Sequence, residues 1–217
     1  FIFQYIYLSF LQSGMRTDVF IGFFDVVIFL GVFQGLFISW FFIKNGVREH
    51  RANLYQGILL LALVMAMSEE WLNNTGLIVR VLPISNYAEW LNFAFGPLFF
   101  LYVKYNLKQE GGRRDWMHFV IAGFWLLNLS FYFMQSPEFK YNSYVYVKHP
   151  DWPTIEAKMI FTDNPLGIRL WTNHLTGIHF IAYIVAAMVI FRRKLQSTSE
   201  RFFIVKDENL KVIRNAI

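Results

Sequence analysis

The sequence has no cysteine among its 217 residues, and this absence excludes disulfide bonds, cysteine zinc sites and thiol nucleophiles. Charged residues are also scarce, at 16% of the chain, whereas an ordinary soluble domain carries about a quarter. Proline occurs only six times, against 25 phenylalanines. This composition is too apolar for an ordinary soluble domain.

Signature motifs of enzymes are missing as well. The sequence contains no HExxH, GxxxxGK[ST], GxGxxG or GxSxG pattern. His174 and His179 lie five positions apart, about 140° around a helix, so they would not share a metal ion on one face. We therefore expect no catalytic residues, no metal site and no cofactor, and we predict that the chain is not an enzyme.

Long apolar blocks are what the sequence does have. Hydrophobic residues make up 56% of the chain and aromatic residues 20%, with a mean hydropathy of +0.37. The apolar residues form blocks long enough to cross a bilayer, and short charged clusters separate the blocks. This pattern predicts an all-α fold: a polytopic integral membrane helix bundle in contact with membrane lipids.

We predict about five transmembrane helices, at residues 19–43, 52–72, 87–103, 116–134 and 171–191. The first has a single charge, Asp25, and at about 1.5 Å per residue it can cross a core of roughly 30 Å. The third contains Gly96 and Pro97, which predict a kink or, alternatively, a moving gate. Residues 18–191 thus form the expected bundle, with an outer connection at 135–170.

The distribution of basic residues predicts the orientation of this bundle. Fourteen of the twenty lysines and arginines lie in the connections 44–53 and 104–115 and in the tail 192–217. Cytoplasmic loops carry the excess of Lys and Arg, so we expect the N-terminus outside and the C-terminus in the cytoplasm. The tail contains no helix-turn-helix, so its charge favours lipid headgroups and we expect no direct nucleic-acid binding by this chain.

Both ends of the sequence suggest further features. Residues 1–17 form an N-terminal extension, and because Met15 resembles a start residue, we expect the part before it not to be native. Residues 192–217 are either a basic cytoplasmic tail or the start of a further helix. Leu210, Ile213 and Ile217 have helical spacing there, and we expect the chain to continue after Ile217.

Three motifs occur in order: LGVFQGLFISWFFIKN at 30–45, FGPLFFLYVKYNL at 95–107 and DWMHFVIAGFWLLNL at 115–129. Over about residues 18–217 the chain resembles the multi-spanning N-terminal region of membrane-bound AraC-type helix-turn-helix regulators of the Bacteroidetes. In that family about seven helices precede a cytoplasmic DNA-binding domain, which is absent here. The resemblance implies a sensory membrane half, whose five spans would be truncated from about seven.

A GxxxG motif in the first block predicts close helix packing. Gly31 and Gly35 would let a second helix approach, and Gln34 would bond across that contact. The partner helix is either another helix of this chain or the same helix of a second copy.

Polar groups gather in the outer part of every predicted span. Charged side chains facing lipid are costly, which suggests a polar, acidic cavity open to the outside that binds an unknown small ligand. The alternative is that helix ends near headgroups are polar in any case. The candidate cavity residues are Asp25, Glu69, Glu70, Asn92, Asn128, His174 and His179.

These observations predict a sensory or signalling module of a transcriptional regulator, multi-pass in the inner (plasma) membrane and without catalysis. Its expected partners are lipids and other membrane helices or protein subunits. One alternative is a structural or accessory subunit of a membrane protein complex. A small transporter is a third interpretation, although transport predicts internal repeats or paired broken helices and only one Gly-Pro break is present.

Overall fold

The computed structural model describes residues 14–48, 50–108, 112–200, 202, 205 and 207–217. Throughout these residues the regular structure is helical, and no strand occurs among them. The all-α fold expected from the sequence is therefore confirmed.

The first two long helices form an antiparallel hairpin. Helix α2 spans Phe23–Arg48 and helix α3 spans Arg51–Asn74. Glycines allow the two backbones to approach: a Cβ on Gly57 would lie 2.7 Å from the amide nitrogen of Ile43, and a Cβ on Gly35 would collide with Val64. Close packing of this kind is the usual basis of helix association where lipid, not water, surrounds the helices.

Helix α4 spans Asn92–Asn106 and follows two 3-10 segments, η1 (Leu77–Ile84) and η2 (Glu89–Leu91). Eight of its 15 residues are buried, because α4 packs between α3 on one side and helix α7 (Thr172–Ser197) on the other. A Cβ on Gly96 would lie 3.0 Å from the Cβ of Tyr183, so a glycine here brings α4 and α7 together. Helix α4 is the central helix of the bundle.

The remaining elements cover the two ends and one side. The 3-10 segment η3 (Asp115–Phe119) leads into α5 (Val120–Phe133), and α6 (Pro137–Lys148) begins where Ser136 Oγ accepts a hydrogen bond from the backbone nitrogen of Phe139, 3.3 Å away. The segment η4 (Ile168–Trp171) precedes α7, and α8 (Glu208–Ala216) ends the chain.

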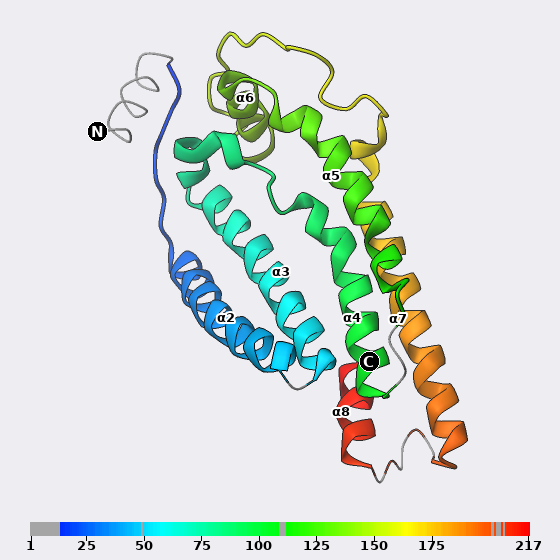
Figure 1. Ribbon diagram of the computed structural model, residues 1–217. Helices are drawn as coiled ribbons and strands as arrows, with labels where there is room; N and C mark the ends of the chain where they lie inside the picture. The colour runs from blue at the N-terminus through cyan, green and yellow to red at the C-terminus, as the bar shows by residue number, and fades with distance from the viewer. Residues whose placement is uncertain (1–13, 49, 109–111, 201, 203–204, 206) are drawn as a thin grey trace.

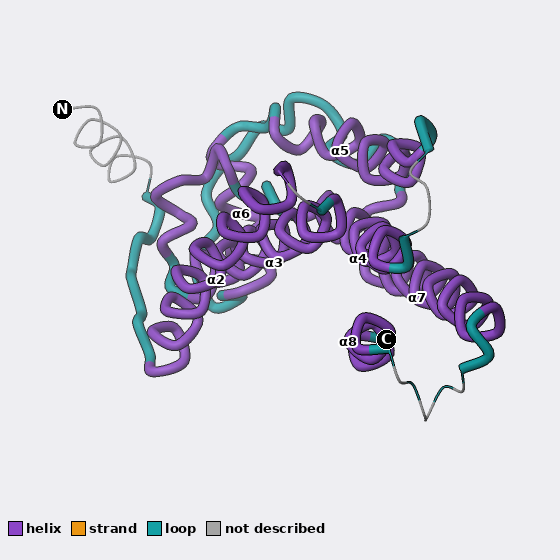
Figure 2. The backbone as a smooth tube through the Cα atoms, turned by 60° about the horizontal axis from the view of Figure 1, so that its bottom comes forward, coloured by secondary structure: helices purple, strands orange, loops and turns teal. Residues whose placement is uncertain are grey.

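Helices α2, α3, α4 and α7 stand side by side in that order, and α5 lies beside α4 (Figure 1). Figure 2 shows the same row from another direction, with α5 and α6 on one side of it and α8 near the end of α4. The C-terminal ends of α2, α4 and α7 lie at the same end of the row, whereas α6 lies at the opposite end (Figure 1). We call these the basic end and the pocket end. The name basic end refers to Lys44, Lys104 and the Arg192–Lys194 run.

Four helical segments are long and apolar enough to cross a membrane: 23–48, 51–74, 115–133 and 168–197. Their outer surfaces are apolar. Phe33 of α2, for example, is 70% exposed. The expected span at 87–103 corresponds to α4, whose 15 residues reach only about 22 Å at 1.5 Å per residue. The membrane helix bundle is thus supported, whereas a count of five spans and an outside N-terminus stay predictions.

At the basic end an apolar cluster joins α8 to the bundle. Leu210 and Ile213 of α8 are buried together with Val103 of α4 and with Phe191 and Leu195 of α7. The helical spacing of Leu210 and Ile213 in the sequence matches this buried face. The tail 192–217 therefore contains a short helix that packs back on α4 and α7.

Candidate ligand pocket

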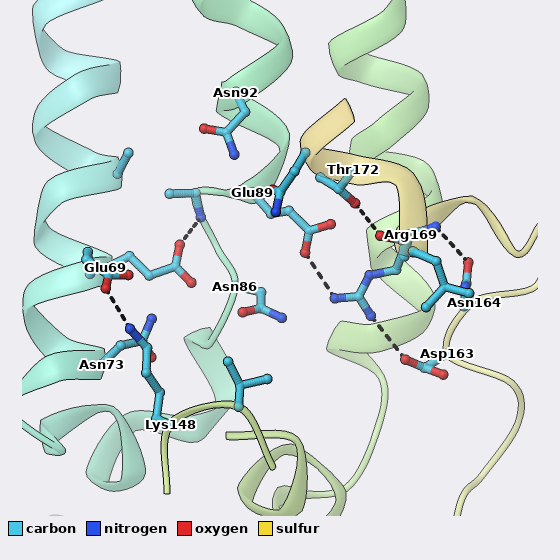
Figure 3. A pocket seen from close by; sticks show the side chains of 16 residues that line it. Glu69, Asn73, Asn86, Glu89, Asn92, Lys148, Asp163, Asn164, Arg169 and Thr172 are labelled. Atoms are coloured by element: carbon cyan, nitrogen blue, oxygen red, sulfur yellow. Dashed lines mark hydrogen bonds and ion pairs between the residues drawn. The ribbon is translucent and has the colours of Figure 1, made fainter. Parts of the chain in front are cut away.

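A pocket of about 840 Å³ opens at the pocket end of the bundle (Figure 3). Its walls come from the last turns of α3, the segment that leads into α4, the end of α6, the connection before η4, and the start of α7. The lining residues are Ala66, Glu69, Glu70, Asn73, Asn86, Ala88, Glu89, Asn92, Val147, Lys148, Asp163, Asn164, Arg169, Leu170, Thr172 and Asn173. Most of them are polar, so the pocket suits a polar ligand.

Glu69 holds the turn before α4 against α3. Its side chain is buried, and Oε2 accepts a hydrogen bond of 2.8 Å from the backbone nitrogen of Ala88. The neighbouring Asn86 adopts a positive φ of 62°, a conformation that Asn tolerates better than most residues. No ion pair joins Glu69 to a basic side chain in the part of the chain that the structure describes.

Arg169 is the centre of a second set of contacts. Its guanidinium donates to Glu89 Oε2 over 3.0 Å and to Asp163 Oδ2 over 3.1 Å, so two carboxylates converge on it (Figure 3). The same guanidinium lies 4.7 Å from the centre of the Tyr132 ring, and Trp125 Nε1 donates to Glu89 Oε1 over 3.0 Å. Arg169 thus ties the start of α7 to α4, α5 and the connection between α6 and η4.

Lys148, the last residue of α6, closes another side of the pocket. Its Nζ lies 2.6 Å from Glu70 Oε1 and 3.0 Å from Asn74 Oδ1, both on α3. The connection 135–170 therefore contributes Lys148, Asp163 and Asn164 to the pocket wall.

Another polar contact fastens α6 to the bundle. Lys140 is buried, and its Nζ donates to the carbonyl oxygens of Pro83 and Phe133 at 3.2 and 2.9 Å. Burial lowers the pKa of Lys140, because the charged form loses hydration.

Tyr87, in the turn before α4, donates to the carbonyl oxygen of Met65 over 2.9 Å, and burial raises its pKa. These contacts fix the pocket walls without filling the pocket.

Three of the seven candidate cavity residues line this pocket: Glu69, Glu70 and Asn92. Asp25 does not, because it lies in the first turn of α2, where Oδ2 accepts from the backbone nitrogen of Gly22 over 2.8 Å. Its carboxylate instead satisfies an amide at the start of its own helix.

The other three candidates also lie outside the pocket lining. Asn128 of α5 is buried, and neither atom of its amide has a hydrogen-bond partner among the described residues. His174 is exposed beside Trp171. His179 packs between Phe93 and Tyr183, at ring-centre distances of 5.6 and 4.9 Å, and both its ring nitrogens are buried without a partner in the described chain.

Sequence reasoning did not select the two basic residues of the pocket, Lys148 and Arg169, as site residues. Both belong to the minority of basic residues outside the three basic regions, and that position was the signal that would have found them. The amides of Asn73, Asn86 and Asn173 were missed because asparagine is common in connections and helix ends.

The GxxxG residues of α2 face α3. A Cβ on Gly35 would collide with Val64, and a Cβ on Gly31 would lie 4.0 Å from Met67 Cε. Gln34 is exposed and makes no hydrogen bond with the described residues. The glycines therefore contact a helix of the same chain, and Gln34 takes no part in that contact.

No group of three or more His, Asp and Glu side chains that could hold a metal ion occurs within the described ranges. No family model, curated protein or solved structure matches the chain.

Proposed function

We propose that this chain is a membrane-embedded sensory module, in which a small polar ligand in the pocket changes how α7 packs against α4. The observation that carries the proposal is the continuity of α7. Its first residues, Thr172 and Asn173, line the pocket, and 26 residues, or about 39 Å at 1.5 Å per residue, lead to the basic end. There Phe191 and Leu195 hold α8.

The contact between α4 and α7 supports such a coupling. Thr172, Thr176, His179 and Tyr183 follow one another at intervals of three or four, so they share one face of α7. Tyr183 meets Gly96 on α4, and its hydroxyl lies 3.1 Å from His118 Nδ1 in η3. Because side chains interlock here, a shift of α7 at the pocket would reach the other end as a rigid movement.

The motifs at 30–45, 95–107 and 115–129 favour placing this module in an AraC-type membrane regulator. The regulator would lie in the inner membrane with several passes and with the basic end in the cytoplasm, since the basic residues gather there. The ligand would act by differential affinity for two arrangements of the helices, without chemical conversion.

Paired spin labels test the coupling, and the absence of cysteine makes the labelling specific. Labels on Lys44→Cys and Ser197→Cys report the distance between α2 and α7 at the basic end. Arg169→Gln in the pocket is expected to change this distance by about 1–2 Å, as in other helix shifts. Lys158→Gln, an exposed basic residue outside the pocket, is the matched control. Equal distances in both variants would contradict the proposal.

The exposed aromatic face of α2 favours a second candidate, an accessory subunit of a membrane complex. Phe33 and Phe37 are 70% and 73% exposed on this face. The coding sequence after Ile217 separates the two: further spans and a helix-turn-helix domain support the regulator, and an early stop codon supports the subunit.

A further inference from the structure

The charges around the pocket are unequal. Four carboxylates line it, on Glu69, Glu70, Glu89 and Asp163, against two basic residues, Lys148 and Arg169. Both basic residues are already engaged by carboxylates, at distances of 2.6 to 3.1 Å. The lining therefore holds more carboxylates than basic side chains, and each basic side chain already has a carboxylate partner.

We propose that the pocket binds a small aliphatic amine that also carries hydroxyl groups. The proposal names the ligand of the sensory pocket and so rests on the function proposed above, but it does not depend on any movement of α7. Its centre is Glu69, which is only 8% exposed and has no basic partner among the described residues. A buried carboxylate is costly unless it is paired, and a ligand ammonium would supply the missing pair.

Four side-chain amides provide the polar contacts for the rest of the ligand. Asn73, Asn86, Asn92 and Asn173 line the pocket, and their side chains form no hydrogen bond within the described part of the chain. Each amide offers two donor hydrogens and an acceptor oxygen. Hydroxyl groups, which donate and accept, match this set better than groups that only accept.

The walls argue against aromatic ligands. No aromatic side chain is present in the lining, and its apolar members are Ala66, Ala88, Val147 and Leu170. A planar ring would therefore find no stacking surface. The volume of about 840 Å³ lies within the range for small-molecule sites.

One feature of the pocket favours the opposite charge. Helix α7 begins at Thr172, and a helix N-terminus acts as about half a positive charge. The carboxyl groups of the lining outnumber its basic side chains by four to two, so they outweigh this dipole. The net preference is for a cation.

Three sugars of one size test the proposal by charge alone: glucosamine, glucose and glucuronate. Each is titrated into the purified chain in lipid nanodiscs, and its Kd is measured by calorimetry. Glucosamine should bind most tightly and glucuronate most weakly. Tighter binding of glucuronate, equal binding of all three, or no saturable binding of glucosamine would overturn the proposal.

Two variants assign the effect to the pocket. Glu69→Gln should raise the Kd of glucosamine at least ~10-fold, which corresponds to the loss of about one charge-assisted bond. The Kd of glucose should stay nearly unchanged. Asn92→Asp adds a carboxylate and should tighten glucosamine, which keeps the test decisive if Glu69→Gln folds poorly. Glu156→Gln, an exposed carboxylate outside the pocket, should change neither. A glucosamine Kd unaffected by both pocket variants would overturn the proposal.

The spin-label distance separates the two proposals. If glucosamine binds without changing the distance between residues 44 and 197, the cation site stands and the sensory function fails. If Arg169→Gln changes that distance while glucuronate binds best, the sensory function stands and the cation site fails.

Discussion

The guanidinium of Arg169 meets the carboxylate of Glu89 at 3.0 Å, and both side chains are only 16% exposed. This contact joins residues that are 80 positions apart and holds η4, which precedes α7, against η2, which precedes α4. Since both helices continue to the basic end, the pair sets their relative position where the pocket begins.

Removing one partner of this pair should destabilise the protein strongly. Glu89→Gln leaves Arg169 with Asp163 as its remaining carboxylate, and we expect a loss of about 3 kcal/mol in the free energy of unfolding, since the buried charge becomes less well compensated. Reversible unfolding of the purified chain in detergent measures this loss. Asp18→Asn breaks the Arg16–Asp18 pair, whose side chains are 47% exposed, and should cost under about 1 kcal/mol. Equal losses would contradict the importance of the buried pair.

The α2–α3 hairpin should require glycine at position 35. Gly35→Ala places a Cβ against Val64, so the helices must separate and the Tm should fall. Gly177→Ala on α7 is the matched control, because no atom lies within 4 Å of its added Cβ. This control should be neutral or stabilising by up to about 1 kcal/mol, since alanine favours a helix. A lower Tm for Gly177→Ala alone would contradict the packing argument.

Alkaline conditions should weaken the attachment of α6 through Tyr144. Burial raises the pKa of Tyr144 to about 12, and its hydroxyl donates to the carbonyl oxygen of Asn73 over 3.2 Å. The unfolded chain loses this proton near pH 10, so the contribution of Tyr144 is complete below pH 10 and is lost as the pH rises to 12. Between pH 10 and pH 12, the free energy of unfolding of Tyr144→Phe should therefore fall less than that of the unchanged protein. Tyr146→Phe, on an exposed residue of α6, should leave this fall unchanged.

Replacing His179 with leucine should stabilise the protein. Both ring nitrogens are buried without partners among the described residues, so His179→Leu should raise the free energy of unfolding by about 1–2 kcal/mol. Tyr183→Phe, which removes the hydroxyl bonded to His118, should lower it by about 1 kcal/mol. Chemical denaturation of the two variants measures both effects. A destabilised His179→Leu would indicate that the imidazole is satisfied by a group such as water.

Several features of the fold followed from local sequence. The first apolar block predicted a span at 19–43, and α2 covers Phe23–Arg48. The block at 87–103 predicted a helix from residue 87, but α4 begins only at Asn92, because the preceding residues form the turn that Glu69 binds. Apolar length cannot distinguish a spanning helix from a short buried one.

The candidate pocket was predicted less completely. Glu69, Glu70 and Asn92 were selected because they end apolar blocks on one side, and the same rule selected Asp25, which lies outside the pocket lining. Asp25 bonds to the backbone at the start of its own helix, a local contact that the position of a charge in a block does not exclude.

By itself, the sequence determined that this protein is a bundle of membrane helices, because apolar length and the clustering of charges are properties of short segments. Only the tertiary structure decided which polar groups meet. Arg169 reaches Glu89 because α7 packs on α4, and Lys148 reaches Glu70, 78 positions away, because α6 packs on the end of α3. Pairing over such separations depends on the packing of whole helices, and no spacing along the chain encodes it.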